Sequence, residues 1–284
     1  MSAIGPEHEA PQASGAGAGA SDAYTVAFGD LGRRVYGLAR LGVVPGEPPT
    51  RSGMGLLFDG ADPIAVRAEG AVSENSPAGV SMETVEPLRR WRVAFEGFDL
   101  ELEALTEPAA LDPKHPVAKA GGMQGYEQLV RVRGAAAGRE IDCLGQRGHS
   151  WGAPDWTKIA LTRTVTAWMD TETSVSVSAV RPTAAEHHAD EAVAATLVSA
   201  GTAFPVVEPL MSTTYDGDGR QRHAGLELWV DEEGGFPYRA AGEVLCGTTL
   251  DLGRLRLDAA FFAWRGEGRT GVGRYDVLRR ADDA

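Results

Sequence analysis

The densest group of side chains that could do chemistry lies in the segment Gly145 to Trp156, which reads GQRGHSWGAPDW. Within it Arg147, His149 and Trp151 alternate with glycine and serine. A histidine can exchange protons near neutral pH, and a tryptophan presents a π face to a ligand or to a transient cation. On a strand, His149 and Trp151 point to the same face because side chains alternate. The block therefore predicts one wall of a pocket.

The same block also fits a tight corner of a sheet. In that interpretation Arg147 pairs with Asp155, which would keep the aspartate ionised, and the two tryptophans Trp151 and Trp156 plug one end of a barrel. Glycines on either side give the backbone the freedom that such crowding requires.

The elements that must position this block are short strands. Apolar residues alternate with polar ones at Val93 and Phe95, at Leu226 and Leu228, and in several other runs, and turn signals separate the runs. Glycine is 36 of 284 residues, which favours many turns. We predict an all-β fold of antiparallel sandwiches or barrels, of which barrels remove exposed sheet edges.

The length accommodates two such domains. Residues 1–22 contain a stretch rich in glycine, alanine and serine with little apolar bulk, which predicts a disordered leader. We expect an N-terminal domain over residues 23–160 and a C-terminal domain over residues 161–284. The segment Thr183 to Ser199 is the best helical candidate, although its alanines also suit an exposed loop.

The charge and the hydropathy of the chain exclude several classes of protein. With 27 basic and 40 acidic side chains the formal charge is −13, which opposes binding to nucleic acid or to anionic membranes. The longest apolar runs are too short for a membrane span, and no secretory signal pattern is present. Two cysteines are too few for a disulfide scaffold, so we expect a cytoplasmic protein.

Cofactor motifs are missing from the sequence. There is no Walker loop, no HExxH, no nucleophile elbow and no glycine-rich dinucleotide loop before a helix. The adjacent His187 and His188 lie in an acidic polar stretch and are interpreted as solvated side chains. We expect neither a metal nor an organic cofactor.

The chain resembles the carotenoid 1,2-hydratase and AttH-like superfamily. The resemblance is carried by Gly125-Tyr-Glu-Gln128, by the block G-x-R-x-H-S-W-G-x-x-D-W from Gly145 to Trp156, and by Gly271-Val-Gly-Arg-Tyr275. It implies two lipocalin-like antiparallel β-barrel domains and a cofactor-free enzyme of hydratase, cyclase or isomerase type. It also implies an apolar substrate of the polyene, terpenoid or polyketide kind.

The resemblance further implies roles for individual residues. His149 and Trp151 match the family's His-x-Trp pair, which is part of the hydratase catalytic site. The family's downstream Tyr-x-Asp pair has its nearest counterpart at Trp168-Met-Asp170, with Trp in place of Tyr. Asp170 would then be the proton donor, held protonated by burial, although the local sequence equally fits a turn with Asp170 at its first position. An alternative placement falls on Ser176 and Ser178, which cannot protonate an alkene.

Further residues are predicted to contact substrate. Trp156 and Trp168 would supply π faces around a carbocation if they converge with Trp151, and we also expect Tyr126, Glu127 and Arg147 at the site. Glu127 either orients His149 by a hydrogen bond or lies on the outward surface of its strand.

Three functional classes remain. The first is a cofactor-free enzyme acting by acid and base chemistry on an apolar small molecule, the second a lipocalin-like carrier of such a ligand, and the third a structural β protein. An ionisable pair inside an apolar pocket would favour the enzyme.

Overall fold

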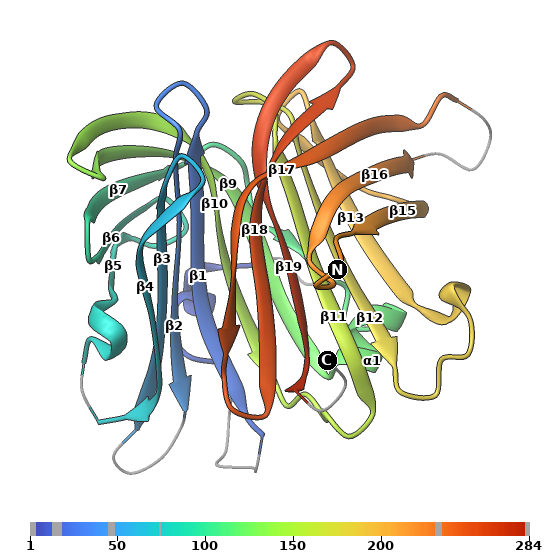
Figure 1. Ribbon diagram of the computed structural model, residues 1–284, viewed down its shortest axis with the longest axis horizontal. Helices are drawn as coiled ribbons and strands as arrows, with labels where there is room; N and C mark the ends of the chain where they lie inside the picture. The colour runs from blue at the N-terminus through green and yellow to red at the C-terminus, as the bar shows by residue number, and fades with distance from the viewer. Residues whose placement is uncertain (1–3, 13–18, 45–48, 74, 231–234, 282–284) are drawn as a thin grey trace. The chain divides into compact units, whose positions relative to one another are not determined.

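The computed structural model describes residues 4–12, 19–44, 49–73, 75–230 and 235–281 (Figure 1). The chain divides into two units, and each one is described by itself. Unit 1 comprises Met1–Lys114 and Gly122–Asp155, and unit 2 comprises His115–Gly121 and Trp156–Ala284.

Unit 1 is built on an antiparallel sheet whose strands, within the described residues, follow the order β4-β3-β2-β1-β10-β9-β7-β6-β5, with β8 paired to β9. Its elements in chain order are the 3-10 helix η1 (Pro6–Glu9), β1 (Ser21–Asp30), β2 (Val35–Val44), β3 (Thr50–Asp59), β4 (Asp62–Val72), the 3-10 helix η2 (Pro77–Gly79), β5 (Ser81–Glu86), β6 (Arg90–Phe95), β7 (Phe98–Ala104), β8 (Ala109–Ala110), β9 (Met123–Ala136) and β10 (Arg139–Gly152).

Unit 2 is also antiparallel, and its described strands follow the order β14-β13-β12-β11-β19-β18-β17-β16-β15. Its elements are the helix α1 (Pro116–Gly121), β11 (Ile159–Trp168), β12 (Ser174–Pro182), the 3-10 helix η3 (His188–Asp190), β13 (Ala192–Ser199), β14 (Thr202–Pro205), β15 (Glu208–Tyr215), β16 (Gln221–Trp229), β17 (Tyr238–Asp251), β18 (Leu255–Gly266) and β19 (Arg269–Arg280).

The two sheets share one connectivity. In each unit the first long strand pairs with the last one, β1 with β10 and β11 with β19, and three further strands follow the first strand outward to one edge. No repeat is visible in the sequence, so the duplication is a property of topology. The first-to-last pairing brings residues near the start of unit 1 next to residues near its end.

Alternating burial explains why these segments form strands. On β6 the side chains of Trp91, Val93 and Phe95 are buried, and arginines alternate with them at the exposed positions nearest Trp91. The sheet curls over this apolar face: a Cβ added to Gly55 of β3 would lie 2.4 Å from the Phe95 ring, although β3 and β6 are far apart in the strand order. The predicted all-β fold of two lipocalin-like domains is confirmed, with each sheet curled into a half-barrel (Figure 1).

Three expectations about local structure need correction. The interval Thr183 to Ser199 is neither a long helix nor an exposed loop, because Ala192–Ser199 forms β13, where Leu197 and Val198 are buried. The chain passes into unit 2 after Asp155, and His115–Gly121 with helix α1 also belongs to unit 2.

The leader is the third correction. Residues 4–12 are ordered and include η1, and β1 begins at Ser21. The prediction of disorder used the low apolar content of this segment. The segment is held by polar contacts, which apolar content does not reveal. Residues 1–3 and 13–18 of the expected leader lie outside the described residues.

A substitution at Gly134 of β9 tests the curvature of the sheet of unit 1. It has φ +138°, and an added Cβ would lie 2.2 Å from the backbone oxygen of Asp99, so Gly134→Ala should lower the free energy of unfolding by about 2 kcal/mol or more. Gly70→Ala on β4 is the matched control, because nothing lies within 4 Å of its added Cβ, and it should change stability by less than about 0.5 kcal/mol. Urea unfolding of both variants measures the difference, and equal midpoints would contradict it.

Candidate functional site

The end of β10 presents the predicted group of side chains. Arg147, His149 and Trp151 share one face of the strand, and the ring centroids of His149 and Trp151 are 5.0 Å apart. On the neighbouring strands Tyr24 of β1 and Tyr126 of β9 lie opposite His149. Their rings lie 4.2 Å and 5.9 Å from the imidazole, so the histidine is enclosed by aromatic surface.

His149 is paired with Asp22 of β1. The imidazole Nε2 lies 2.7 Å from Asp22 Oδ1, and both side chains are fully buried. The other ring nitrogen, Nδ1, lies 2.7 Å from the backbone oxygen of His8. A carbonyl oxygen only accepts, so Nδ1 carries a hydrogen. The hydrogen bond between Nε2 and Oδ1 joins His149 and Asp22 into one unit that is able to hold a proton.

Arg147 lies beside this pair in the same interior. Its Nη1 donates to the hydroxyl of Tyr126 at 2.6 Å, and its Nη2 donates to Glu9 Oε2 at 2.5 Å. The guanidinium carbon lies 4.8 Å from the ring centroid of Trp91, 5.2 Å from that of Tyr126 and 5.7 Å from that of Tyr24. Only 3% of the arginine side chain is exposed, so its charge is held by one carboxylate and three π faces.

Glu9 comes from the segment expected to be disordered. Its carboxylate is 7% exposed and accepts hydrogen bonds from Arg147, from the backbone N–H of Leu88 at 3.0 Å, and from Trp91 Nε1 at 3.3 Å. The hydroxyl of Tyr24 donates to the backbone oxygen of Glu9 at 2.8 Å. The segment of residues 5–12, which we call the N-terminal segment, therefore lies against the interior of unit 1.

Tyr126 acts here as a hydrogen-bonding phenol. Burial raises the pKa of Tyr126 to about 12, against the opposing effect of Arg147. Its hydroxyl accepts from Arg147 and donates toward the backbone oxygen of His8 at 3.4 Å. A neutral phenol beside a guanidinium can polarise a bound oxygen atom, and it is not a base at neutral pH.

Two contacts predicted as alternatives for this region are not formed in the structure, and Glu127 follows its second alternative, the outward face of its strand. Arg147 pairs with Glu9 and not with Asp155, whose side chain is exposed after the end of β10. Glu127 does not orient His149: it follows Tyr126 on β9 and so points to the other face, where it accepts from Gln146 Nε2 at 2.7 Å. Asp22 takes the orienting role.

Of the two interpretations of Asp170, a buried acid or a turn residue, the structure agrees with the turn. Asp170 lies in a turn after β11 of unit 2, with 41% of its side chain exposed, and pairs with Arg269 at 2.8 Å. Partial burial acts to raise its pKa, but hydrogen bonds from the Glu172 and Thr173 backbone and the charge of Arg269 outweigh it and lower the pKa below its usual value. A carboxyl group in this state is ionised at neutral pH.

The tryptophans separate into different parts of the chain. Trp151 is half-buried in unit 1, where Trp91 of β6 is the other tryptophan near Arg147. Trp168 is buried at the end of β11, and Trp156 is half-buried in the turn before that strand, both in unit 2. The sequence analysis did not identify Trp91, Asp22 or Glu9 as site residues. A carboxylate at Asp22 on the apolar face of a strand could have indicated the site, because such a buried charge needs a partner.

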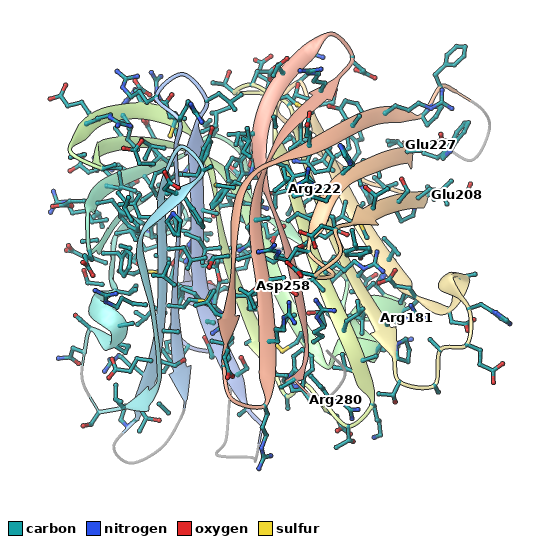
Figure 2. The ribbon with its side chains drawn as sticks, viewed as in Figure 1. Arg181, Glu208, Arg222, Glu227, Asp258 and Arg280 are labelled. Atoms are coloured by element: carbon teal, nitrogen blue, oxygen red, sulfur yellow. The ribbon has the colours of Figure 1, made fainter. Side chains whose placement is uncertain are left out.

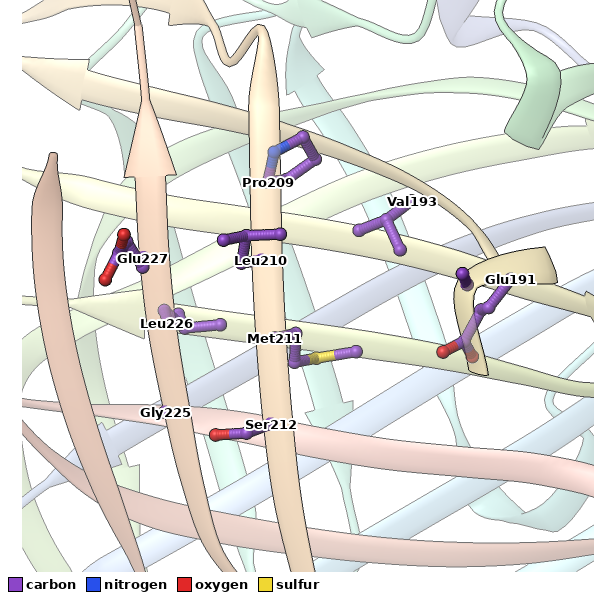
Figure 3. Close-up of a pocket in the computed structure, with 10 residues that line it drawn as sticks. Glu191, Val193, Pro209, Leu210, Met211, Ser212, Gly225, Leu226 and Glu227 are labelled. Atoms are coloured by element: carbon purple, nitrogen blue, oxygen red, sulfur yellow. The ribbon is translucent and has the colours of Figure 1, made fainter. Parts of the chain in front are cut away.

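Unit 2 carries a separate cleft of about 670 Å³ between β13, β15 and β16 (Figure 3). Its apolar lining includes Leu210, Met211 and Leu226, and the carboxylates of Glu191 and Glu227 flank it. Glu191 lies 3.1 Å from Arg163, with both side chains almost fully buried. This cleft has the apolar character that the sequence led us to expect of a ligand pocket.

Asp258 is another buried carboxylate of unit 2. It lies on β18 (Figure 2). Its side chain accepts from Thr249 Oγ1 at 2.6 Å and from the guanidinium groups of Arg256 and Arg279. Its donors come from three neighbouring strands, β17, β18 and β19. His187 is exposed, and the side chain of His188 lies outside the described residues. Across the described ranges no cluster of three or more His, Cys, Asp or Glu is placed to hold a metal ion.

Comparison with known proteins gives a family and a fold. A family model described as "Domain of unknown function (DUF7064)" matches residues 5–281, so the match includes the N-terminal segment. No curated protein matches the chain.

Solved structures share the fold at low identity. Kievitone hydratase from Nectria haematococca superposes with a TM-score of 0.61 at 11% identity, over 100% of this chain and 95% of that one. CghA gives 0.61 at 11% identity, over 93% of this chain and 89% of that one. CghA with Sch210972 gives 0.56 at 10% identity with the same coverage. The resemblance stated from the sequence is thereby confirmed for the fold.

The protonation of His149 is directly measurable. Because the His8 backbone oxygen can only accept, nitrogen-15 NMR at pH 7 should show a hydrogen on Nδ1 of His149, in slow exchange with solvent owing to burial. A His149→Gln variant assigns the signal by its loss. An Nδ1 resonance typical of a nitrogen without hydrogen would contradict the described geometry.

Proposed function

The chain belongs to the DUF7064 family, a domain of unknown function, and we propose that it is a cofactor-free enzyme that transfers protons on an apolar small molecule. The observation that carries the proposal is the buried His149–Asp22 pair enclosed by the rings of Tyr24, Tyr126 and Trp151. An ionisable pair within aromatic surface is what an enzyme needs and a carrier does not. The similar structure named as a hydratase supports this choice.

Asp22 replaces Asp170 in the proposed mechanism. Asp22 holds Nε2 of His149, which orients the ring and stabilises the imidazolium, so Nδ1 is the nitrogen that exchanges a proton with substrate. The His8 backbone oxygen now occupies that position, and a substrate would take its place.

In a hydration, His149 gives its Nδ1 proton to one alkene carbon, water adds to the other, and the proton lost by the water returns to Nδ1. In an isomerisation or cyclisation the substrate returns a carbon-bound proton instead. The rings of Tyr24, Tyr126 and Trp151 enclose the place where this proton transfer occurs. Each cycle leaves the enzyme unchanged.

The acid strength of an imidazolium limits the class of substrate that it can protonate. An imidazolium is a weak acid compared with what an isolated alkene requires, so the double bond must be polarised by a neighbouring oxygen function. Arg147 and the Tyr126 hydroxyl lie next to His149 and can stabilise charge on such an oxygen. This favours an oxygenated, polyketide-like molecule over a hydrocarbon polyene or terpenoid.

A carrier of an apolar ligand is the second candidate, and the cleft between β13, β15 and β16 favours it (Figure 3). Leu210 is also 48% exposed at that cleft, which gives an apolar ligand a contact surface. A carrier would bind ligand without exchanging any carbon-bound proton with solvent.

The proposed location is the cytoplasm. Cys143 and Cys246 are both free, and burial raises the pKa of each thiol to about 12, so neither is poised to form a disulfide. Within the described ranges, no helix has the length and apolar character needed to cross a bilayer.

Solvent deuterium incorporation tests the proposal without knowledge of the product. A panel of oxygenated alkenes is incubated in D₂O, and mass spectrometry measures deuterium bound to carbon. The wild-type chain should label at least one member, and His149→Gln and Asp22→Asn should each lower the rate by about a hundredfold or more.

Two variants serve as controls for this experiment. Ser150→Ala changes the neighbouring residue on the opposite face of β10, and Asp170→Asn changes the exposed turn of unit 2, so both should keep the wild-type rate. Circular dichroism checks that every variant is folded. Equal labelling by the wild-type chain and His149→Gln, or loss of labelling in Asp170→Asn alone, would contradict the assignment.

A further inference from the structure

We propose that Thr84, Leu88, Trp91 and Arg147 form a binding site for the carboxylate of an organic acid, and that the chain's own Glu9 occupies it in this structure. We call these four residues the carboxylate site. The carboxylate site lies beside His149, so its ligand would also be the substrate of the proposed enzyme. That identification of the ligand with the substrate rests on the proposed function. The binding itself is a separate claim.

The donors of the carboxylate site converge on one position. Arg147 Nη2 donates to Glu9 Oε2 at 2.5 Å, and the Leu88 backbone N–H donates to Oε1 at 3.0 Å. The Trp91 indole N–H lies 3.3 Å from each of these two oxygens. The Thr84 hydroxyl adds a donor at 3.4 Å. These groups come from three separate strands and a turn, and one of them is a guanidinium, so the site fits a planar anion with two oxygens.

The backbone conformation at Leu88 directs its N–H toward the bound carboxylate. Leu88 has φ +59° in the turn between β5 and β6, a conformation that costs free energy for a residue with a side chain. Its N–H donates to Glu9, while its backbone oxygen accepts from Gln128 Nε2 at 3.2 Å. Gln128 is itself buried and also donates to the backbone oxygen of Thr106 at 3.1 Å. The site is therefore held by groups that do not belong to the N-terminal segment.

The N-terminal segment is held in place by polar contacts. None of its η1 residues is fully buried, and the apolar cluster of unit 1 includes no residue from 4–12 among the described ones. Its polar contacts include the Glu9 carboxylate, the backbone oxygens of His8 and Glu9, and the Gln12 N–H, which donates to Asp22 Oδ2 at 2.5 Å. A ring contact joins His8 and Trp151, whose centroids lie 6.1 Å apart. A ligand that brings one carboxylate and one carbonyl oxygen can replace the contacts to Arg147 and His149.

Displacement has to be an exchange of one anion for another. A guanidinium that is 3% exposed is strongly destabilised without a counterion, so the segment cannot leave and let the site stand empty at low cost. Water and a neutral alcohol are poor substitutes, whereas a second carboxylate satisfies the same donors. The expected ligand is thus an amphipathic acid whose apolar body contacts the aromatic rings around His149.

Glu9→Gln in the 284-residue chain tests the exchange, with octanoate as the probe and octanol as the neutral control. The amide keeps the shape of the side chain but removes the charge that competes with the probe. Trp91 lies at the site, so tryptophan fluorescence, supported by calorimetry, follows binding. Octanoate should bind Glu9→Gln about tenfold or more tightly than it binds the wild-type chain, and octanol should bind neither better.

Glu7→Gln is the matched control on the same segment, because the Glu7 side chain is 72% exposed, and it should leave the affinity for octanoate unchanged. In Glu9→Gln/Arg147→Met the guanidinium is gone and an unbranched apolar side chain takes its place, so the gain should be lost. If Glu9→Gln proves too unstable, Glu9→Asp keeps the charge on a shorter side chain and should show an intermediate gain.

The outcomes separate the two proposals. No gain in folded Glu9→Gln and folded Glu9→Asp, or equal gains for octanol and octanoate, would overturn the carboxylate site. Neither result would affect deuterium labelling that depends on His149. Tight octanoate binding without any labelling would instead leave the carboxylate site standing and remove the proposed enzyme.

Discussion

A guanidinium removed from water needs a counterion, and the interior of unit 1 is organised around meeting that need at Arg147. The side chain lies among three aromatic rings, where an unpaired charge would be strongly destabilising, and Glu9 supplies the carboxylate. Once Glu9 is fixed, the adjoining His8 backbone oxygen meets Nδ1 of His149, and the same oxygen faces the hydroxyl of Tyr126. A segment with almost no apolar bulk is thereby ordered by one ion pair and the hydrogen bonds around it.

Topology places the second charged pair next to the first. Because β1 and β10 are neighbours in the sheet, Asp22 reaches His149 across 127 positions of sequence, and the two-residue period of β10 sets Arg147 on the same face. One curled antiparallel sheet therefore presents a proton-holding pair and a cation side by side among aromatic rings. That combination is what proton transfer next to a polarised oxygen requires, and it explains why we place the proposed chemistry and the proposed carboxylate ligand on one surface.

The sequence predicts what depends on local pattern. The alternation of apolar residues identifies the strands, and the spacing of His149 and Trp151 places both on one face. Prediction from the sequence fails where a residue's partner is remote along the chain, or where one local pattern fits two structures. Glu9 sits in a stretch whose composition is typical of disorder, and only the tertiary contact with a buried arginine shows its role. Asp170 fits a buried acid and a turn equally well, and its exposure decides for the turn. Asp22 was overlooked because its partner lies at the other end of the unit.

The central claim is that the Glu9–Arg147 pair holds the N-terminal segment against the interior, and a double-mutant cycle of unfolding free energies measures it most directly. Glu9→Gln, Arg147→Met and the double variant are compared with the wild-type chain by urea unfolding. Since each single change leaves the other partner buried without its counterpart, the double variant should be more stable than the sum of the single losses predicts, by about 1.5 kcal/mol or more. Additive losses within about 0.5 kcal/mol would show that the pair is not coupled and would contradict the account.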